Sequence, residues 1–176
     1  MRRGLESRSA LVLAGAGCCM LWQGCAGYHL GSVQPEAFRH VRSVAVPAFR
    51  NETLEPRIAV MVTNAVIEAI QRDGTYRVAT AAGADARLEG VVRQIKRRQV
   101  RSTRQDTLGS LELEFTLEVD YVFRDLASYR VLAEGQIEGS GHQFLDPNFQ
   151  LSEREALPVA AERLAVGLVS RISEGW

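Results

Sequence analysis

The sequence predicts an α+β domain, a two-layer sandwich in which two helices cover one face of a mostly antiparallel sheet of about four to five strands. The stretch 111–123 alternates strictly between apolar and polar residues, as a strand with one buried and one solvated face does. Two further segments, 57–74 and 152–174, carry apolar residues at helical spacing. The later strands are joined by loops too short for helical crossovers, so we expect them to form an antiparallel meander.

The N-terminal residues indicate a targeting segment. Arg2, Arg3 and Arg8 form a short basic region, and the uncharged, mostly apolar run 10–22 follows it. This run is shorter than the roughly 20 residues that a membrane span needs, and its length is typical of a signal-peptide core. We therefore expect residues 1–24 to be a signal peptide; a short buried N-terminal helix is the alternative.

The cysteines point to a lipid anchor. Cleavage before Cys25 would remove Cys18 and Cys19, so Cys25 would be the first residue of the mature chain and could form no intramolecular disulfide. Gly24 suits a lipoprotein signal, whereas Trp22 stands where leucine is usual. We expect lipid attachment at Cys25, with more than one acyl chain because a single chain binds membranes only marginally. A free or paired thiol is the alternative.

A tether and an edge-like strand follow the cysteine. Residues 25–42 lack periodicity and contain glycines and a proline, so we expect a tether that leads into a single domain at 43–176. The stretch 43–49 is apolar enough for a strand. Because Pro47 has no backbone donor, we place this strand near a sheet edge, or Pro47 at the strand end.

A helix and a short strand come next. After a polar loop at 50–56, Pro56 suits the first turn of a helix at 57–74. The pair Asp73-Gly74 is a typical helix end. The apolar stripe of this helix consists of Val62, Ala65, Val66, Ala69 and Ile70. The segment 75–80 then predicts a short strand.

The remaining strands are predicted from period-2 patterns. In 84–101 the alternation slips, because Leu88 and Val92 share one face while Val91 and Ile95 share the other. A bulge near Gly90, or burial of both faces there, would reconcile them. The stretch 111–123 is followed by a turn at 124–128 and a strand at 129–141. The inward residues of that last strand are expected to be Tyr129, Val131, Ala133 and Ile137.

The C-terminal segment 152–174 completes the predicted order β-α-β-β-β-β-α. Ser152 and Glu155 have the spacing of a capping box, which predicts a helix start near 152. Pro158 is acceptable only in the first turns of this helix, because a proline in a helix interior removes a hydrogen bond.

Signatures of catalysis are scarce. The histidines, His29, His40 and His142, have no second histidine or cysteine at metal-ligand spacing. There is no glycine-rich phosphate loop and no nucleophile motif. The carboxylates of 112–120 alternate along a strand, which favours a solvated strand face over a pair of catalytic acids. We therefore expect a protein that is not an enzyme and binds no cofactor or metal.

Positive charge gathers in the stretch 93–104, which has no acid before Asp106. One interpretation is that Arg93 and Arg97 pair across the ladder with the glutamates of 112–118. The other is a basic tip that binds a polyanion, since arginine can hold a phosphate with two parallel hydrogen bonds. Nucleic acid is not expected, because no aromatic residues stand between the cations. The cations are Arg93, Lys96, Arg97, Arg98, Arg101 and Arg104.

Four stretches carry a resemblance to one family by their order and spacing. They are GCAGYHLGS (24–32), VAVPAFRNETLEPRIAVMVTNAVIEAI (44–70), DGTYRV (73–78) and ADARLEGVV (84–92). The chain resembles the LptE family of lipopolysaccharide-assembly lipoproteins. This resemblance implies an α/β sandwich in a lipid-anchored, non-catalytic protein of the outer membrane, on its periplasmic side or within a barrel lumen.

The resemblance also implies partners. A protein of this kind would plug an LptD-type β-barrel and help to assemble it for lipopolysaccharide export to the cell surface. Binding of lipopolysaccharide through basic residues would favour the 93–104 cluster as the candidate site. The alternative is another exported α/β lipoprotein, such as a CsgG-like pore subunit or an activator of cell-wall synthases. Those proteins also favour a VAVxxFxN strand, and they would form rings or bind a synthase.

Overall fold

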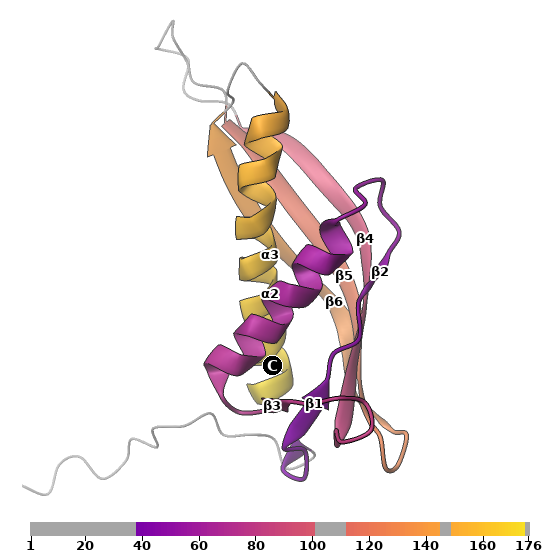
Figure 1. Cartoon of the computed structure of the whole chain (residues 1–176). Helices are drawn as coiled ribbons and strands as arrows, with labels where there is room; N and C mark the ends of the chain where they lie inside the picture. The colour runs from indigo at the N-terminus through magenta and orange to yellow at the C-terminus, as the bar shows by residue number, and fades with distance from the viewer. Residues whose placement is uncertain (1–37, 101–111, 145–148, 175–176) are drawn as a thin grey trace, which may run out of the picture. The chain divides into compact units, whose positions relative to one another are not determined.

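The computed structural model describes residues 38–100, 112–144 and 149–174 (Figure 1), which belong to one compact unit, 32–176. The fold is α+β, as predicted, with two helices and a sheet. Its elements are β1 (Ser43–Ala45), β2 (Arg50–Asn51), α2 (Ile58–Asp73), β3 (Arg77–Val78), β4 (Ala86–Val100), β5 (Glu112–Asp125), β6 (Val131–Phe144) and α3 (Phe149–Glu174).

The sheet has six strands. Five follow the order β3-β1-β4-β5-β6, and the sixth, β2, pairs with β4 further along that strand than β1 does. The long strands β4, β5 and β6 form the predicted antiparallel meander, whereas β1, β2 and β3 run parallel to their neighbours. The expectation of four to five mostly antiparallel strands was therefore slightly off, because the sheet has six strands and is mixed. The reason is that α2 carries the chain from β1 to its neighbour β3, and such a helical crossover returns the chain in the same direction.

The segment 50–56, expected to be a loop, begins with the two residues of β2. Asn51 then turns the chain, because its side-chain amide donates to the carbonyl of Glu55 at 2.8 Å and its oxygen accepts the N–H of Thr53 at 2.9 Å. Pro47 lies two residues past the end of β1, as one of the two predictions for it expected. The other prediction, that this strand lies near a sheet edge, was wrong, because β1 lies between β3 and β4.

Helix α2 ends as the sequence predicts. Gly74 adopts φ 78°, the left-handed conformation that glycine tolerates. Its N–H donates to the carbonyl of Ile70 at 3.1 Å, which satisfies a backbone group at the helix end.

The bulge in β4 lies at Arg93, between Val92 and Gln94, and not near Gly90. The extra residue returns Ile95 to the face that Val92 occupies, which resolves the slip in the pattern. Gly90 has a different role: a Cβ there would lie 2.3 Å from the ring of Phe49. The glycine therefore makes room for a buried aromatic side chain.

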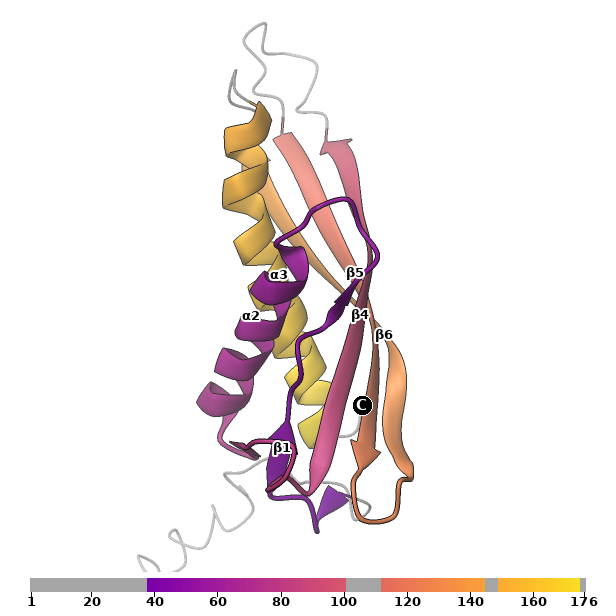
Figure 2. The same ribbon diagram turned by 45° about the vertical axis from the view of Figure 1, so that its right-hand side comes forward.

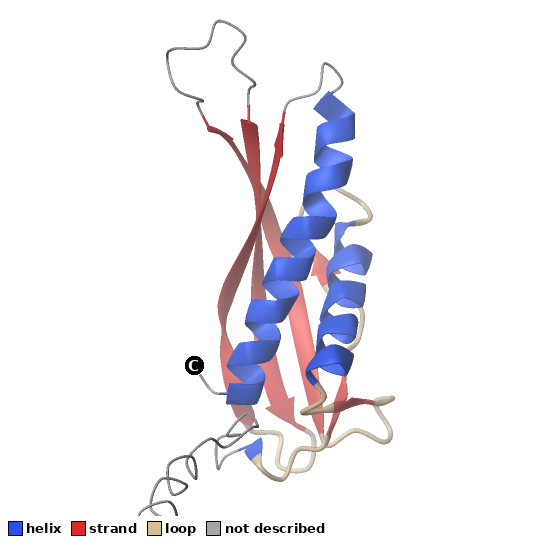
Figure 3. Ribbon diagram, turned by 90° about the vertical axis from the view of Figure 1, so that its left-hand side faces the viewer, coloured by secondary structure: helices blue, strands red, loops and turns tan. Residues whose placement is uncertain are grey.

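Both helices cover the same face of the sheet (Figures 2 and 3). The odd-numbered residues of β5 from Leu113 to Phe123 are all buried on that face, which confirms the strict alternation. Helix α3 packs over β5 and β6, and α2 lies beside it. The largest fully buried side chains include Phe115, Phe123 and Leu164, so the core lies between the two layers.

Glycines on β6 bring α3 unusually close to the sheet. A Cβ on Gly139 would lie 2.3 Å from the carbonyl oxygen of Ala160 and 2.5 Å from the Cβ of Leu164. A Cβ on Gly141 would lie 2.3 Å from the carbonyl oxygen of Ala156. Since real side chains do not approach so closely, this contact between helix and strand backbones requires glycine at both positions.

Two predictions near β6 were wrong. Tyr129 lies in the turn before the strand, with φ 57° and a side chain that is 73% exposed. Val131 pairs with Arg124, because the register shifts between Phe123 and Arg124. That shift turns Val131 away from the helices, while Ile137 stays buried as expected.

The start of α3 was also predicted wrongly. The helix begins at Phe149, so Ser152 lies within it, and Pro158 is beyond its first turns. Tertiary packing holds the helix through the proline, because Ala156, Leu157 and Ala160 around it are buried against the sheet. Packing of this kind routinely overrides the local helix propensity.

Candidate functional site on the open face of the sheet

The face of the sheet that points away from the helices is polar. No element of the described chain covers it (Figure 2). We call this surface of β4, β5 and β6 the open face. The register places these side chains on it: Gln94, Lys96 and Arg98 from β4, Glu114, Thr116, Glu118 and Asp120 from β5, and Gln136, Glu138, Ser140 and His142 from β6.

The bulged Arg93 links β4 to β5 and to the residue that follows β2. Its Nε donates to Asp120 Oδ2 at 2.6 Å, and its Nη1 donates to Glu52 Oε2 at 2.5 Å. The hydrogen bond from Arg93 holds the pKa of Asp120 below its usual value. Sequence analysis missed Glu52 as a partner, because it follows β2 and lies far from Arg93 along the chain.

Glu118 is the centre of the charge network. Lys96 Nζ lies 2.7 Å from Glu118 Oε2 and 3.0 Å from Glu138 Oε1. Gln94 and Gln136 donate to the two oxygens of Glu118 at 2.7 and 2.6 Å. The hydrogen bond from Lys96, supported by that from Gln94, lowers the pKa of Glu118, whose side chain is only 10% exposed. This carboxylate is ionised and fully engaged.

A third pair lies nearer the end of β4. Arg98 Nη2 lies 2.7 Å from Glu114 Oε2, and His142 Nε2 lies 3.7 Å from Glu114 Oε1. The side chain of Arg98 is 75% exposed. An ion pair so exposed contributes roughly 0–1 kcal/mol to stability.

The structure divides the predicted basic cluster. One interpretation expected Arg93 and Arg97 to pair with the glutamates of 112–118. Arg93 instead pairs with Asp120 and Glu52, and the cations that pair with Glu118 and Glu114 are Lys96 and Arg98. Arg97 is exposed and pairs in register with buried Phe115, so it lies on the opposite face from the other three. Arg101, Arg104 and Cys25 lie outside the described residues.

The open face mixes both signs of charge and has no acid–base pair set apart for catalysis. Each lysine or arginine on its β4 positions is matched by at least one carboxylate within 3.0 Å. Such a surface is well hydrated and suits contact with another polar surface. Within the described ranges, no cluster of histidine, cysteine and acidic side chains could hold a metal ion.

A second polar cluster lies where β5 ends. Asp125 accepts the N–H and the hydroxyl of Ser128 at 2.6 and 2.8 Å, and its other oxygen pairs with His40. These bonds, the Ser128 N–H foremost, lower the pKa of Asp125 to about 2. Nearby, Asp85 accepts the N–H groups of Arg42 and Ser43. The bonds between Asp125 and Ser128 are local, but His40 and Asp125, and Asp85 and its partners Arg42 and Ser43, are far apart in sequence, so no local pattern marks those contacts.

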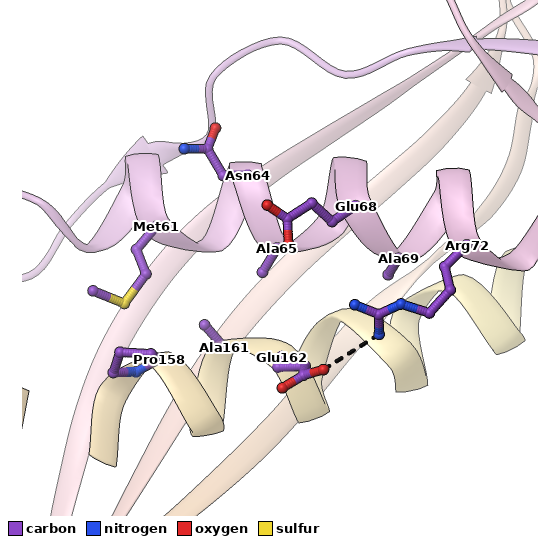
Figure 4. Close-up of a pocket in the computed structure, with 9 residues that line it drawn as sticks. All are labelled: Met61, Asn64, Ala65, Glu68, Ala69, Arg72, Pro158, Ala161 and Glu162. Carbon is purple, nitrogen blue, oxygen red and sulfur yellow. Dashed lines mark hydrogen bonds and ion pairs between the residues drawn. The ribbon is translucent and has the colours of Figure 1, made fainter. Parts of the chain in front are cut away.

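A groove separates the two helices on their outer side (Figure 4). It encloses about 360 Å³ and arises where small residues face each other, such as Ala65 on α2 and Ala161 on α3. Arg72 Nη1 donates to Glu162 Oε1 across it at 3.2 Å. Met61 and Pro158 lie at the same end of the groove. This shallow groove contains no arrangement of nucleophile and base.

The chain was compared with known proteins. The family model LptE, described as lipopolysaccharide-assembly, matches residues 41–172. No curated protein matches. No helix of the described residues is long and apolar enough to cross a membrane.

Several solved structures are similar at low identity. A PelC dodecamer from Paraburkholderia phytofirmans has 18% identity and a TM-score of 0.44, over 74% of this chain and 88% of that chain. A minor lipoprotein from Acinetobacter baumannii has 10% identity and a TM-score of 0.48, over 76% and 94%. The hypothetical protein CT253 from Chlamydia trachomatis has 11% identity and a TM-score of 0.49, over 77% and 96%. The family match spans most of the domain, and the chain belongs to the LptE family of lipopolysaccharide-assembly proteins.

Proposed function

We propose that this protein is a lipid-anchored, non-catalytic lipoprotein of the outer membrane that plugs an LptD-type β-barrel and helps to assemble it for lipopolysaccharide export. Membership of the lipopolysaccharide-assembly family over residues 41–172 is the observation that carries the proposal. The anchor would be lipid on Cys25, exposed after removal of residues 1–24.

The open face supports a place inside a barrel. The lumen of an outer-membrane barrel is polar, and its apolar outer band is about 25 Å tall. The 15 residues of β4 extend about 45 Å at the usual rise of a strand. A sheet of that length, with its ion pairs exposed, could follow the wall of the lumen and exchange hydrogen bonds with it.

Lipopolysaccharide contact would fall to the basic cluster at 93–104, whose arginine forks would grip phosphate. The carboxylates near Arg93, Lys96 and Arg98 would compete with a glycolipid phosphate for these side chains. Arg97 lies on the other face of β4, so the cluster would present cations on both faces of the strand.

Site-specific photocrosslinking in cells tests the barrel partnership. A photoreactive residue at Thr116 on the open face should form an adduct with one large, heat-modifiable barrel protein, and a residue at buried Val66 should form none. Adducts only between copies of this chain would favour the ring-forming alternative and contradict the proposal.

A second experiment tests the lipid anchor. Cys25→Ser should abolish lipid attachment, and unchanged membrane fractionation would contradict the anchor.

A further inference from the structure

Three segments that are far apart in sequence meet at the end of the domain where the described chain begins. The N–H of Arg77 donates to the carbonyl of Arg42 at 2.9 Å, and the N–H of Leu126 donates to the carbonyl of Asp85 at 2.8 Å. Asp85 in turn donates its own N–H to the carbonyl of Ser43 at 3.0 Å. Figure 1 shows β1, β3 and the turn between β5 and β6 together at this end. We call this surface the entry end, and its segments are 38–43, 75–85 and 124–131.

The entry end is basic. Its segments hold five arginines and two aspartates, which is a net charge of +3 with histidine neutral. The two aspartates accept N–H groups of the same end, Asp85 those of Arg42 and Ser43 and Asp125 that of Ser128. The last turns of α2 and α3 add no net charge, because each contains one arginine and one acid. The five arginines are Arg39, Arg42, Arg77, Arg124 and Arg130.

Three of these arginines differ from the cations of the open face. Arg42, Arg77 and Arg130 are exposed, and among the described residues no ion pair joins any of them to a carboxylate. Lys96 and Arg98 on the open face, by contrast, each have a carboxylate within 3.0 Å. An arginine that no internal carboxylate occupies can hold an external phosphate with two parallel hydrogen bonds.

An aromatic side chain projects from the same surface. Tyr129 is 73% exposed and has φ 57°, a left-handed conformation that is uncommon for residues other than glycine. Arg124 Nη1 donates to the carbonyl of Tyr129 at 3.2 Å and so supports this turn. Beside the tyrosine, Leu126 and the alanines between 81 and 84 line a hollow of about 470 Å³. Tyrosine is enriched where lipid meets water, because its ring is apolar and its hydroxyl stays hydrated.

The proposed lipid anchor determines which anions this end would meet. The 12 residues 26–37 separate Cys25 from Phe38, and 12 residues span at most about 40 Å. Lipid on Cys25 would therefore hold the entry end within that distance of the membrane. Anionic lipids give a membrane a negative surface potential that attracts nearby arginines. The partner that suits this surface is thus a layer of lipid headgroups.

We propose that the entry end binds the headgroups of an anionic membrane, with Arg42, Arg77 and Arg130 on lipid phosphates and Tyr129 at the level of the headgroups. This contact rests on the lipid anchor proposed above and supplies a second attachment, because acyl chains and a basic patch together bind a membrane more firmly than either does alone. The entry end and the open face are different surfaces, so the membrane contact leaves the open face free for a barrel.

Fluorescence quenching by brominated lipid tests the contact. The full chain is purified from bacterial membranes and reconstituted into phosphatidylcholine vesicles with or without phosphatidylglycerol. The indole introduced by Tyr129→Trp, measured against the unsubstituted chain, should be quenched in the anionic vesicles. The quenching should be at least about twofold weaker in neutral vesicles or at high salt, because salt screens exposed charges.

Val159→Trp provides the control for position. Val159 is exposed, but it precedes Glu174 by 15 residues, or about 22 Å along α3. The indole introduced there should show no quenching that depends on lipid charge. Equal quenching at the two positions would mean that the chain binds the vesicles without using the entry end, and it would contradict the proposal.

Paired arginine variants test the role of charge. Arg77→Gln with Arg130→Gln should reduce the quenching of the Tyr129→Trp indole to the level in neutral vesicles, because each cation near an anionic surface strengthens attachment by roughly fivefold. Arg50→Gln with Arg57→Gln removes two other exposed arginines, at β2 and before α2, and should have no effect. Equal effects of the two pairs, or quenching that ignores lipid charge, would overturn the proposal.

Mass spectrometry of the N-terminal peptide reports the anchor separately. Acylated protein whose Tyr129→Trp indole is not quenched would overturn the membrane contact and leave the anchor standing. Protein without acyl chains on Cys25 would contradict the anchor. The same vesicles mixed with that protein still test the entry end, because the arginine pairs should then differ in their effect on quenching in the same way.

Discussion

Replacing Asp125 by asparagine should destabilise the fold by about 2 kcal/mol at pH 7. The carboxylate is almost fully buried and accepts bonds from the N–H and hydroxyl of Ser128 and from His40. These bonds lower its pKa from 3.8 to about 2. One pKa unit corresponds to about 1.4 kcal/mol of preference for the ionised form, so this shift corresponds to about 2 kcal/mol. Asparagine keeps the shape and one acceptor oxygen but loses the charge.

The pH dependence has a definite sign. A carboxyl whose folded pKa is lowered stabilises the fold above its unfolded pKa of 3.8, and this contribution is lost as the pH falls through about 2. Urea unfolding of both proteins should therefore show a difference at pH 7 that shrinks between pH 4 and pH 2. Asp73→Asn, at an exposed helix end, is the matched control and should change stability by less than about 0.5 kcal/mol. Equal unfolding free energies at pH 7, or a difference that persists at pH 2, would refute the reasoning.

Three further outcomes are expected. Gly139→Ala should lower the free energy of unfolding in urea by at least about 1–3 kcal/mol, because the new Cβ meets the backbone of α3. Gly83→Ala, where the Cβ has only an ordinary contact at 4.0 Å, should be nearly neutral. Similar urea midpoints for the two variants would contradict the close contact between α3 and β6. Arg93→Ala should leave the urea midpoint nearly unchanged despite its two ion pairs, because exposed ion pairs contribute little to stability; a clear loss of stability would contradict this expectation. Arg97→Glu combined with Arg98→Glu should reduce lipopolysaccharide binding in a pull-down, because both changes remove cations from the 93–104 cluster, and unchanged binding would exclude the cluster as the contact.

The sequence predicted best what depends on local pattern. The alternation of β5 predicted which of its side chains are buried, because a strand with one buried face needs an apolar residue at every second position. Gly74 predicted where α2 ends, because the residue after the helix adopts a left-handed conformation that favours glycine. The slip in β4 was detected: Val91 and Val92 are both buried, which was one of the two expectations, while the bulge lies at Arg93 and not near Gly90. Gly90 was the natural suspect for a bulge, yet it is fixed by the ring of Phe49, a tertiary contact between β4 and the residue just before β2.

What depends on tertiary contacts could not be predicted. Strand β2 consists of two polar residues and exists because β4 offers it an edge. Helix α3 continues through Pro158 because its neighbours pack on the sheet. The cations of the basic cluster can be read from the sequence, but a bulge decides that Arg93 joins the open face while Arg97 faces the other way. The partner Glu52 and the His40–Asp125 pair join residues that only the fold brings together.

The place of β1 inside the sheet has a mechanical consequence. The strand follows directly on the N-terminal segment, so tension on that segment enters the domain at residues 38–43. A pull along β1 loads its bonds to β3 and β4 together: Arg77 and Ala79 donate to the carbonyls of Arg42 and Val44, and Asp85 donates to that of Ser43. An edge strand would instead peel away one bond at a time. A load applied along β1 is thus received in shear, between two hydrogen-bonded neighbours.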